Sequence, residues 1–199
     1  MLCTTGAAPV FTRGHARVPF DGGAGMKWIL LALAGLFGLV LLLVAVGLLR
    51  PRDHVARTRV HLATSAVEAW AVLADLDRWD EWSPDIESME RLPDRDGRPV
   101  WRARGKWGEP TEVRESDPPR LLRTFVDGGS FQGTWTYELE PEGGGSRLTI
   151  TEHGEVGNPF FRGMMVFRDE GVSMRAFLAA FGTRLGESVR PETLREPRP

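Results

Sequence analysis

Residues 133–185 read GTWTYELEPEGGGSRLTITEHGEVGNPFFRGMMVFRDEGVSMRAFLAAFGTRL, and their pattern of apolar and polar residues is the main indication of the fold class. Two runs of alternating apolar and polar residues flank the glycines at 143–145, which is typical of a β-hairpin. Asn158 and Pro159 then predict a helix N-terminus, because asparagine caps the first turn and proline fits the first helical position. From Phe160 to Leu185 apolar residues recur every three or four positions, interrupted once by Gly171. We therefore expect a long amphipathic helix lying on an antiparallel sheet.

The residues before the hairpin extend this sheet. From Asp85 to Val156 short apolar runs alternate with glycine, proline and aspartate turns, and no connection is long enough for a crossover helix. Residues 55–62 alternate as a first strand. Ser65 and Glu68 then form a capping-box pattern that predicts a helix, and a second short helical turn ends at Ser83-Pro84.

Four segments carry a resemblance to a known family: Val60–Leu62 leading into Ala66–Trp70, the turn Asp77–Pro84, the strand Gly133–Trp135, and Arg147–Glu152 leading into Asn158-Pro159. With the order of elements above, they make residues 55–187 resemble the START-like SRPBCC superfamily, especially its polyketide cyclase/dehydrase-like branch. The resemblance implies an α+β helix-grip fold, with a curved antiparallel sheet of about seven strands gripping a long C-terminal helix. It also implies an apolar cavity between sheet and helix that accepts lipids, sterols, polyketides or other hydrophobic molecules.

Residues 28–49 contain no polar side chain apart from the indole of Trp28, and as a helix they would be about 33 Å long. A buried core helix usually carries a polar stripe, and a signal peptide has an apolar region of only about 7–15 residues. We therefore favour an uncleaved, single-pass transmembrane helix over both alternatives. Basic residues flank the segment on both sides, so the side of the membrane on which the soluble domain lies stays open.

The sequence divides into five parts. These are an N-terminal tail at 1–27, the transmembrane helix at 28–49, a linker at 50–54, the START-like domain at 55–187 and a flexible tail at 188–199. Met26 lies directly before the apolar segment, so either translation starts there or residues 1–25 form a real tail. The single cysteine, Cys3, leaves the redox compartment undecided.

The net charge and the absence of several binding motifs argue against some classes of function. The net charge is −2, and the acidic excess lies after residue 50, which argues against a nucleic-acid partner. No Cys/His ligand set, phosphate-binding glycine loop or dinucleotide motif is present, so we expect no metal and no cofactor. Asp80, Glu81 and Asp85 cluster near two tryptophans, and we interpret them as a solvated turn.

Catalysis has one weak candidate. Glu152 shares strand parity with Leu148 and Ile150, so its carboxylate either enters the cavity or, near the strand end, reaches water, whereas His153 falls on the polar face. Gly171 either makes room for a ligand or marks a helix break.

We favour binding over catalysis, with a polyketide cyclase/dehydratase-like enzyme or a protein-interaction module with a filled core as the alternatives. The partners expected are a hydrophobic small molecule or lipid and, through the N-terminal helix, a membrane; ligand identity and oligomeric state stay open. The expected ligand-binding residues are Trp79, Trp82, Trp101, Phe125, Trp135, Tyr137, Ile150, Met164, Phe167, Gly171, Met174 and Leu178.

Overall fold

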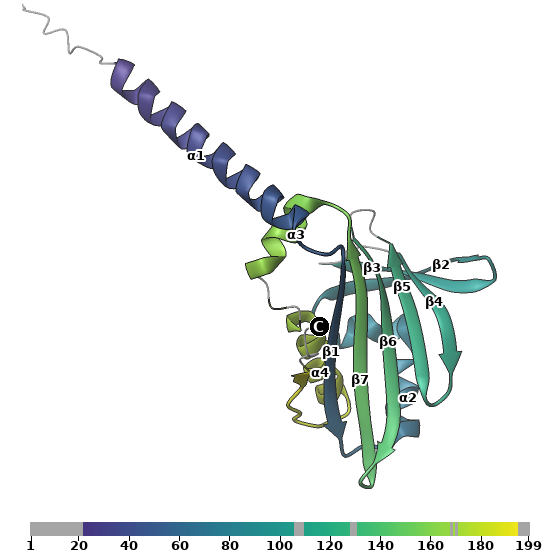
Figure 1. Ribbon diagram of the computed structural model, residues 1–199. Helices are drawn as coiled ribbons and strands as arrows, with labels where there is room; N and C mark the ends of the chain where they lie inside the picture. The colour runs from purple at the N-terminus through teal and green to yellow at the C-terminus, as the bar shows by residue number, and fades with distance from the viewer. Residues whose placement is uncertain (1–21, 106–109, 128–130, 168, 170, 195–199) are drawn as a thin grey trace, which may run out of the picture. The chain divides into compact units, whose positions relative to one another are not determined.

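The computed structural model describes residues 22–105, 110–127, 131–167, 169 and 171–194 (Figure 1). These residues divide into two compact units, one ending at Leu39 and one beginning at Val40. The start of helix α1 belongs to the first unit, and its last turns belong to the second. The elements in chain order are α1 (Gly22–Leu48), β1 (Asp53–Leu62), α2 (Ala66–Leu73), η1 (Leu76–Glu81), β2 (Ile86–Arg95), β3 (Arg98–Gly105), β4 (Pro110–Asp117), β5 (Leu121–Asp127), β6 (Phe131–Glu142), β7 (Gly145–Val156), α3 (Pro159–Met164), η2 (Met165–Phe167), α4 (Val172–Arg184) and β8 (Glu192–Leu194).

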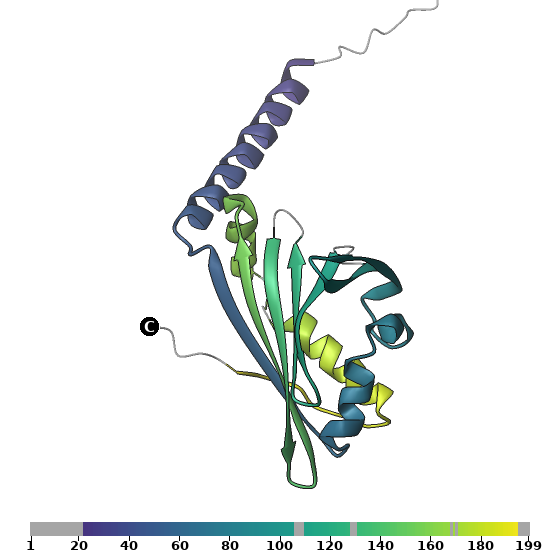
Figure 2. The same ribbon diagram turned by 90° about the vertical axis from the view of Figure 1, so that its right-hand side faces the viewer.

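One open antiparallel sheet organises the second unit. Its strand order is β2-β3-β4-β5-β6-β7-β1-β8, so the first strand of the domain lies between the last two. Helices α2 and α4 lie on the same side of the sheet (Figure 2). The expected α+β helix-grip fold is confirmed, with eight strands rather than about seven.

The core lies between the sheet and these helices. Leu148 and Ile150 of β7, Leu178 and Phe181 of α4 and Leu73 of α2 have no exposed surface. Each large apolar side chain buried in this way contributes roughly 1.5–3 kcal/mol. The faces of strand and helix that the sequence pattern marks as apolar are therefore the faces that meet.

Both predicted helix starts are confirmed. The Ser65 hydroxyl accepts a hydrogen bond from the Glu68 amide at 3.4 Å and donates one to the Glu68 carboxylate at 2.7 Å. The Asn158 side chain accepts from the Phe160 amide at 2.9 Å, with Pro159 at the first helical position. Side-chain oxygens thus satisfy backbone donors that have no partner within their own helix.

The expected single helix over 160–185 is wrong, because the segment forms α3, η2 and α4. Gly171 stands at the N-cap of α4, and its amide donates to the Asp169 carboxylate at 3.0 Å. The two helices bury against different surfaces. The α4 helix turns Met174, Leu178 and Phe181 to the core, whereas α3 packs on the last turns of α1.

The boundaries at both ends of the domain also differ from expectation. Strand β1 begins at Asp53, inside the expected linker. The expected flexible tail includes β8, which pairs antiparallel with Arg57–Arg59 of β1. Short strands of three residues are difficult to recognise in a sequence rich in proline and charge. The expectation that translation starts at Met26 concerns mainly residues 1–21, which lie outside the described residues.

Candidate functional site

The strand register places a mixed row of side chains across the inner face of the sheet. Glu152 of β7 lies opposite Ala56 of β1 on one side and Trp135 of β6 on the other. Trp135 in turn lies opposite Thr124 of β5, which lies opposite Val113 of β4. Because directly paired residues share a face of a sheet, these five side chains point the same way. We call this set the inner row.

A carboxylate and an imidazole approach each other beside the inner row. The His54 Nε2 atom lies 4.0 Å from Glu152 Oε1, and the two side chains are only 15% and 11% exposed. His54 reaches this position from the first residues of β1, two positions before Ala56 on the same face. Because little water surrounds the pair, a protonated His54 would attract the Glu152 carboxylate more strongly than it would in bulk water.

The next row toward the core holds two buried hydroxyls. Burial is the main cause that raises the pKa of the Tyr137 phenol above its ordinary value. The charge of Glu152 raises this pKa further, whereas the hydrogen bond with Thr124 lowers it. Tyr137 therefore stays protonated and can serve as a hydrogen-bond donor. Thr58 of β1 is fully buried, and its Oγ1 has no hydrogen-bond partner within the described part of the chain.

Aromatic rings fill the space between the sheet and α4. Trp79 of η1 and Trp82, the residue after η1, contact Phe177 of α4 with ring centroids 5.3 and 5.0 Å apart. Tyr137 lies 5.9 Å from Trp79, and Phe181 lies 5.6 Å from Trp82. The expected cavity does not occupy this part of the interface, so a ligand on the inner face would lie beside this aromatic cluster, toward the inner row.

The structure separates the expected ligand-binding residues into two groups. Eight of them belong to the core or pack against it from the inner side: Trp79, Trp82, Trp101, Trp135, Tyr137, Ile150, Met174 and Leu178. Four others lie elsewhere: Phe125, Met164, Phe167 and Gly171.

Each of these four departures has a physical reason. Phe125 pairs with Thr134 on the outer face, where the Arg114 guanidinium lies 3.9 Å from its ring centroid. Met164 and Phe167 are exposed because α3 and η2 leave the line of α4. A Cβ atom at Gly171 would meet the Thr193 side chain of β8 at 2.5 Å. This glycine therefore makes room for the last strand.

Sequence reasoning missed His54 and Thr124 as site residues. Extending the alternation of β1 upstream by one step, from Ala56, places His54 on the inner face. Thr124 has the parity of Leu122, which is also buried, but only the pairing of β5 with β6 brings it to Trp135. Threonine in a strand is so common that its residue type alone gives no signal.

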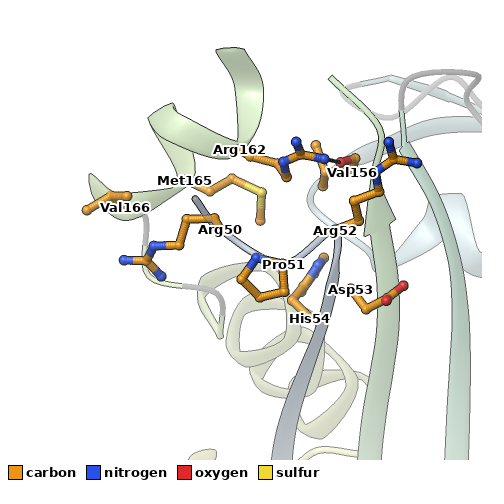
Figure 3. Close-up of a pocket in the computed structure, with 9 residues that line it drawn as sticks. All are labelled: Arg50, Pro51, Arg52, Asp53, His54, Val156, Arg162, Met165 and Val166. Carbon is orange, nitrogen blue, oxygen red and sulfur yellow. Dashed lines mark hydrogen bonds between the residues drawn. The ribbon is translucent and has the colours of Figure 1, made fainter. Parts of the chain in front are cut away.

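His54 lines two surface hollows, neither of which is lined by a member of the inner row itself. One of about 310 Å³ opens on the outer face around Val55, Phe125, Thr134 and His153. A smaller one of about 110 Å³ lies between the 50–52 linker and α3 (Figure 3).

The acidic cluster of η1 has structural roles. Glu81 pairs with Arg78 at 2.6 Å and with Arg184 of α4 at 3.2 Å, and Asp80 accepts from the Met89 amide at 3.2 Å. Within the described part of the chain, no three His, Cys, Asp or Glu side chains lie close enough together to hold a metal ion.

The inner row and its neighbours combine two chemistries. Trp135 and Val113 offer apolar contact, while Glu152 and His54 offer hydrogen-bonding groups that are largely shielded from solvent. Binding pockets commonly have this composition, in which apolar walls supply affinity and few polar groups fix orientation. A carboxylate beside an imidazole is also able to move a proton.

Comparisons with known proteins agree on family and fold. The family described as "Polyketide cyclase / dehydrase and lipid transport" matches residues 53–186. No curated protein sequence matches the chain.

Among solved structures, the Zhui aromatase/cyclase from Streptomyces sp. R1128 is 19% identical, with a TM-score of 0.55 over 68% of this chain and 93% of its own. A START superfamily protein from Mycobacterium smegmatis is 16% identical, with a TM-score of 0.53 over 67% of this chain and 97% of its own. A conserved protein from Geobacillus kaustophilus is also 16% identical, with a TM-score of 0.53 over 70% of this chain and 99% of its own. At these identities the likeness concerns the fold alone.

Proposed function

Because the chain belongs to the polyketide cyclase/dehydrase and lipid transport family, we propose that it is a membrane-anchored protein that binds a hydrophobic small molecule or lipid. The ligand lies against the inner row, next to the aromatic cluster under α4. Its apolar part contacts Trp135, and a polar group reaches Glu152 or His54.

Inward-facing apolar side chains that are not fully covered carry this proposal. Trp101, Val113 and Trp135 pack against the core, yet each retains some exposed surface. A single tryptophan is rarely buried completely, but three apolar side chains left partly uncovered on one inner face form an apolar surface that a ligand can cover. A hydrophobic ligand would remove that surface from water, gaining roughly 25 cal/mol per Å².

The proposed anchor is α1. Residues Gly25–Leu48 are long and apolar enough to cross a membrane, although a signal sequence near the N-terminus would meet the same criterion. Arg162 of α3 favours an uncleaved helix, because its Nε donates to the Gly47 carbonyl at 2.8 Å. Cleavage that removed the end of α1 would leave this buried guanidinium without one of its acceptors, which is costly.

Binding is tested with the full chain purified in nanodiscs and examined by native mass spectrometry for apolar molecules that copurify or can be titrated. We expect Trp135→Ala to weaken binding by about tenfold or more, since it removes the largest apolar contact. The control is Phe125→Ala, which truncates an aromatic residue on the outer face of the neighbouring strand.

Equal binding by both variants would remove Trp135 from the site. If the wild-type chain holds no apolar molecule at all, the binding proposal fails. The filled aromatic cluster would then favour a protein-interaction module.

The His54–Glu152 pair favours a second candidate, a polyketide cyclase/dehydratase-like enzyme that uses Glu152 to move a proton. Glu152→Gln keeps the shape of the side chain and removes its charge. If the chain is such an enzyme, the variant should still hold the ligand and should no longer convert it, as seen by the mass of the bound molecule. Conversion at the wild-type rate by this variant would exclude Glu152 as the acid or base.

A further inference from the structure

Residues 159–167, which form α3 and η2, present an unusually apolar surface, and we call them the interfacial segment. Arg162 is its only charged residue, and that side chain is buried. Short helices at a protein surface normally turn polar side chains to water. Here the exposed side chains are Phe161 (47%), Met164 (43%), Val166 (42%) and Phe167 (82%).

The interfacial segment is fixed to the last turns of α1, within the same compact unit. A Cβ atom at Gly163 would lie 2.0 Å from the Leu43 carbonyl oxygen, and one at Gly47 would lie 1.7 Å from the Pro159 carbonyl oxygen. The two backbones therefore touch through glycines, as helices do in membranes.

Arg162 directs its charge away from the exposed apolar surface. Its Nε donates to the Gly47 carbonyl, and its Nη1 donates to the Val156 carbonyl at 3.1 Å and to the Gly157 carbonyl at 3.3 Å. Figure 3 shows the side chain reaching toward Val156 at the end of β7. Three backbone carbonyls thus surround the guanidinium, and only apolar groups remain on the outside.

The contact with Leu43 sets the depth of the segment. Leu43 precedes the end of α1 at Leu48 by about 7.5 Å of helix, at 1.5 Å per residue. If α1 spans a bilayer, the interfacial segment lies where headgroups meet acyl chains. At that depth exposed phenylalanine and methionine are favourable and exposed charge is not.

We propose that the interfacial segment is a second membrane contact, whose exposed apolar side chains insert into the bilayer surface on the side where α1 ends. This inference rests on the proposed anchoring by α1. It turns the domain from a tethered body into one that is docked on the lipid surface.

The charges that follow α1 fit a surface containing anionic lipids. Arg50 and Arg52 are exposed and lie beside the interfacial segment, around the small hollow of Figure 3. Neither forms an ion pair with another residue in the described ranges. Guanidinium groups just outside a membrane helix are well placed to meet lipid phosphates.

The test uses the full chain in liposomes of phosphatidylcholine and phosphatidylglycerol, with Cys3→Ser as the background. Single cysteines at Phe167→Cys, Phe161→Cys, Val67→Cys and Leu36→Cys carry an environment-sensitive fluorophore, and lipids brominated along their acyl chains serve as quenchers. Val67 is the matched control, because it is an exposed apolar residue (67%) on α2. Leu36 lies in the apolar part of α1 and reports on anchoring itself.

We expect the labels at Phe167 and Phe161 to be quenched several times more strongly than the label at Val67. The inference is overturned if the Leu36 label is quenched while the Phe167 and Phe161 labels behave like Val67, and in that case anchoring stands alone. An unquenched Leu36 label would defeat the anchoring proposal and this inference together. A label at Phe167 that is shielded from water but not quenched by lipid would show that a second protein surface covers the segment, which also overturns the inference.

Discussion

Glu187 stabilises a turn that lies far from it in the sequence. Its carboxylate accepts hydrogen bonds from the backbone amides of Ala63 and Thr64 at 2.8 Å each, and from the Thr64 hydroxyl. Burial raises the pKa of Glu187, but these hydrogen bonds outweigh it and hold the pKa below its ordinary value of 4.5. The charged form is thus the one that the folded state favours.

Glu187→Gln should lower the free energy of unfolding by about 1.5 kcal/mol at neutral pH, because a charge-assisted acceptor is lost. A pKa that is lowered on folding stabilises the protein above the unfolded-state pKa, and this stabilisation is lost as the pH falls through the folded-state pKa. The difference between wild type and variant should therefore shrink below about pH 4.5. Denaturant unfolding in detergent micelles across this pH range measures it.

The control is Glu155→Gln, an exposed carboxylate with no hydrogen bond to another described residue. The Glu155→Gln variant should have nearly the same free energy of unfolding as the wild type at every pH. A Glu187→Gln penalty that stays constant from neutral to acidic pH would mean that the shape of the side chain matters and its charge does not.

The position of a residue is easier to predict from the sequence than its contacts with distant residues. The inward position of Glu152 follows from the alternation of β7, and the structure places it there at 9% exposure. The partners of Glu187 do not follow from any local pattern, because they lie more than 120 residues away. Alternation assigns a face, whereas it assigns no neighbour across the fold.

At the scale of elements, the contact between α1 and α3 depends on the absence of side chains. Gly163→Ala would place a Cβ atom against the Leu43 backbone, which has no rotamer with which to move away. We expect a loss of about 2 kcal/mol in unfolding free energy, typical of overpacking. Thermal or denaturant unfolding of the full chain in micelles measures the loss.

Gly157→Ala is the matched control, since a Cβ atom there meets nothing within 4 Å. It should be neutral or slightly stabilising. If Gly163→Ala is as stable as Gly157→Ala, the two helices do not pack as closely as the structure shows.

The break between α3 and α4 explains why the helical periodicity was misleading. The spacing of apolar residues from Phe160 to Phe181 fits one continuous stripe. The first part of that stripe belongs to a segment whose apolar side chains are exposed, and the second part covers the sheet. Periodicity shows that a residue avoids water and does not show which surface it contacts.

At the scale of the whole molecule, turns and alternation were sufficient to predict the antiparallel meander from β2 to β7. They were not sufficient to place β1, which pairs with β7 through Thr58↔Ile150 and with β8 through Thr58↔Thr193. The inner row is also only partly predictable. Alternation identifies Trp135 and Tyr137 as inward, but packing decides that Tyr137 joins the aromatic cluster while Trp135 keeps exposed surface.

The position of β1 between β7 and β8 has a consequence for biosynthesis. The ribosome makes β1 first among the strands, yet both of its partners are made near the end of the chain. At usual rates of translation, β1 therefore remains without its partner strands for on the order of ten seconds. During this time the unpaired strand is prone to associate with other nascent chains. If α1 is the membrane anchor proposed above, its early insertion would hold β1 at one place on the membrane and away from other ribosomes until β7 emerges. Under that proposal, α1 has a role before the domain has folded.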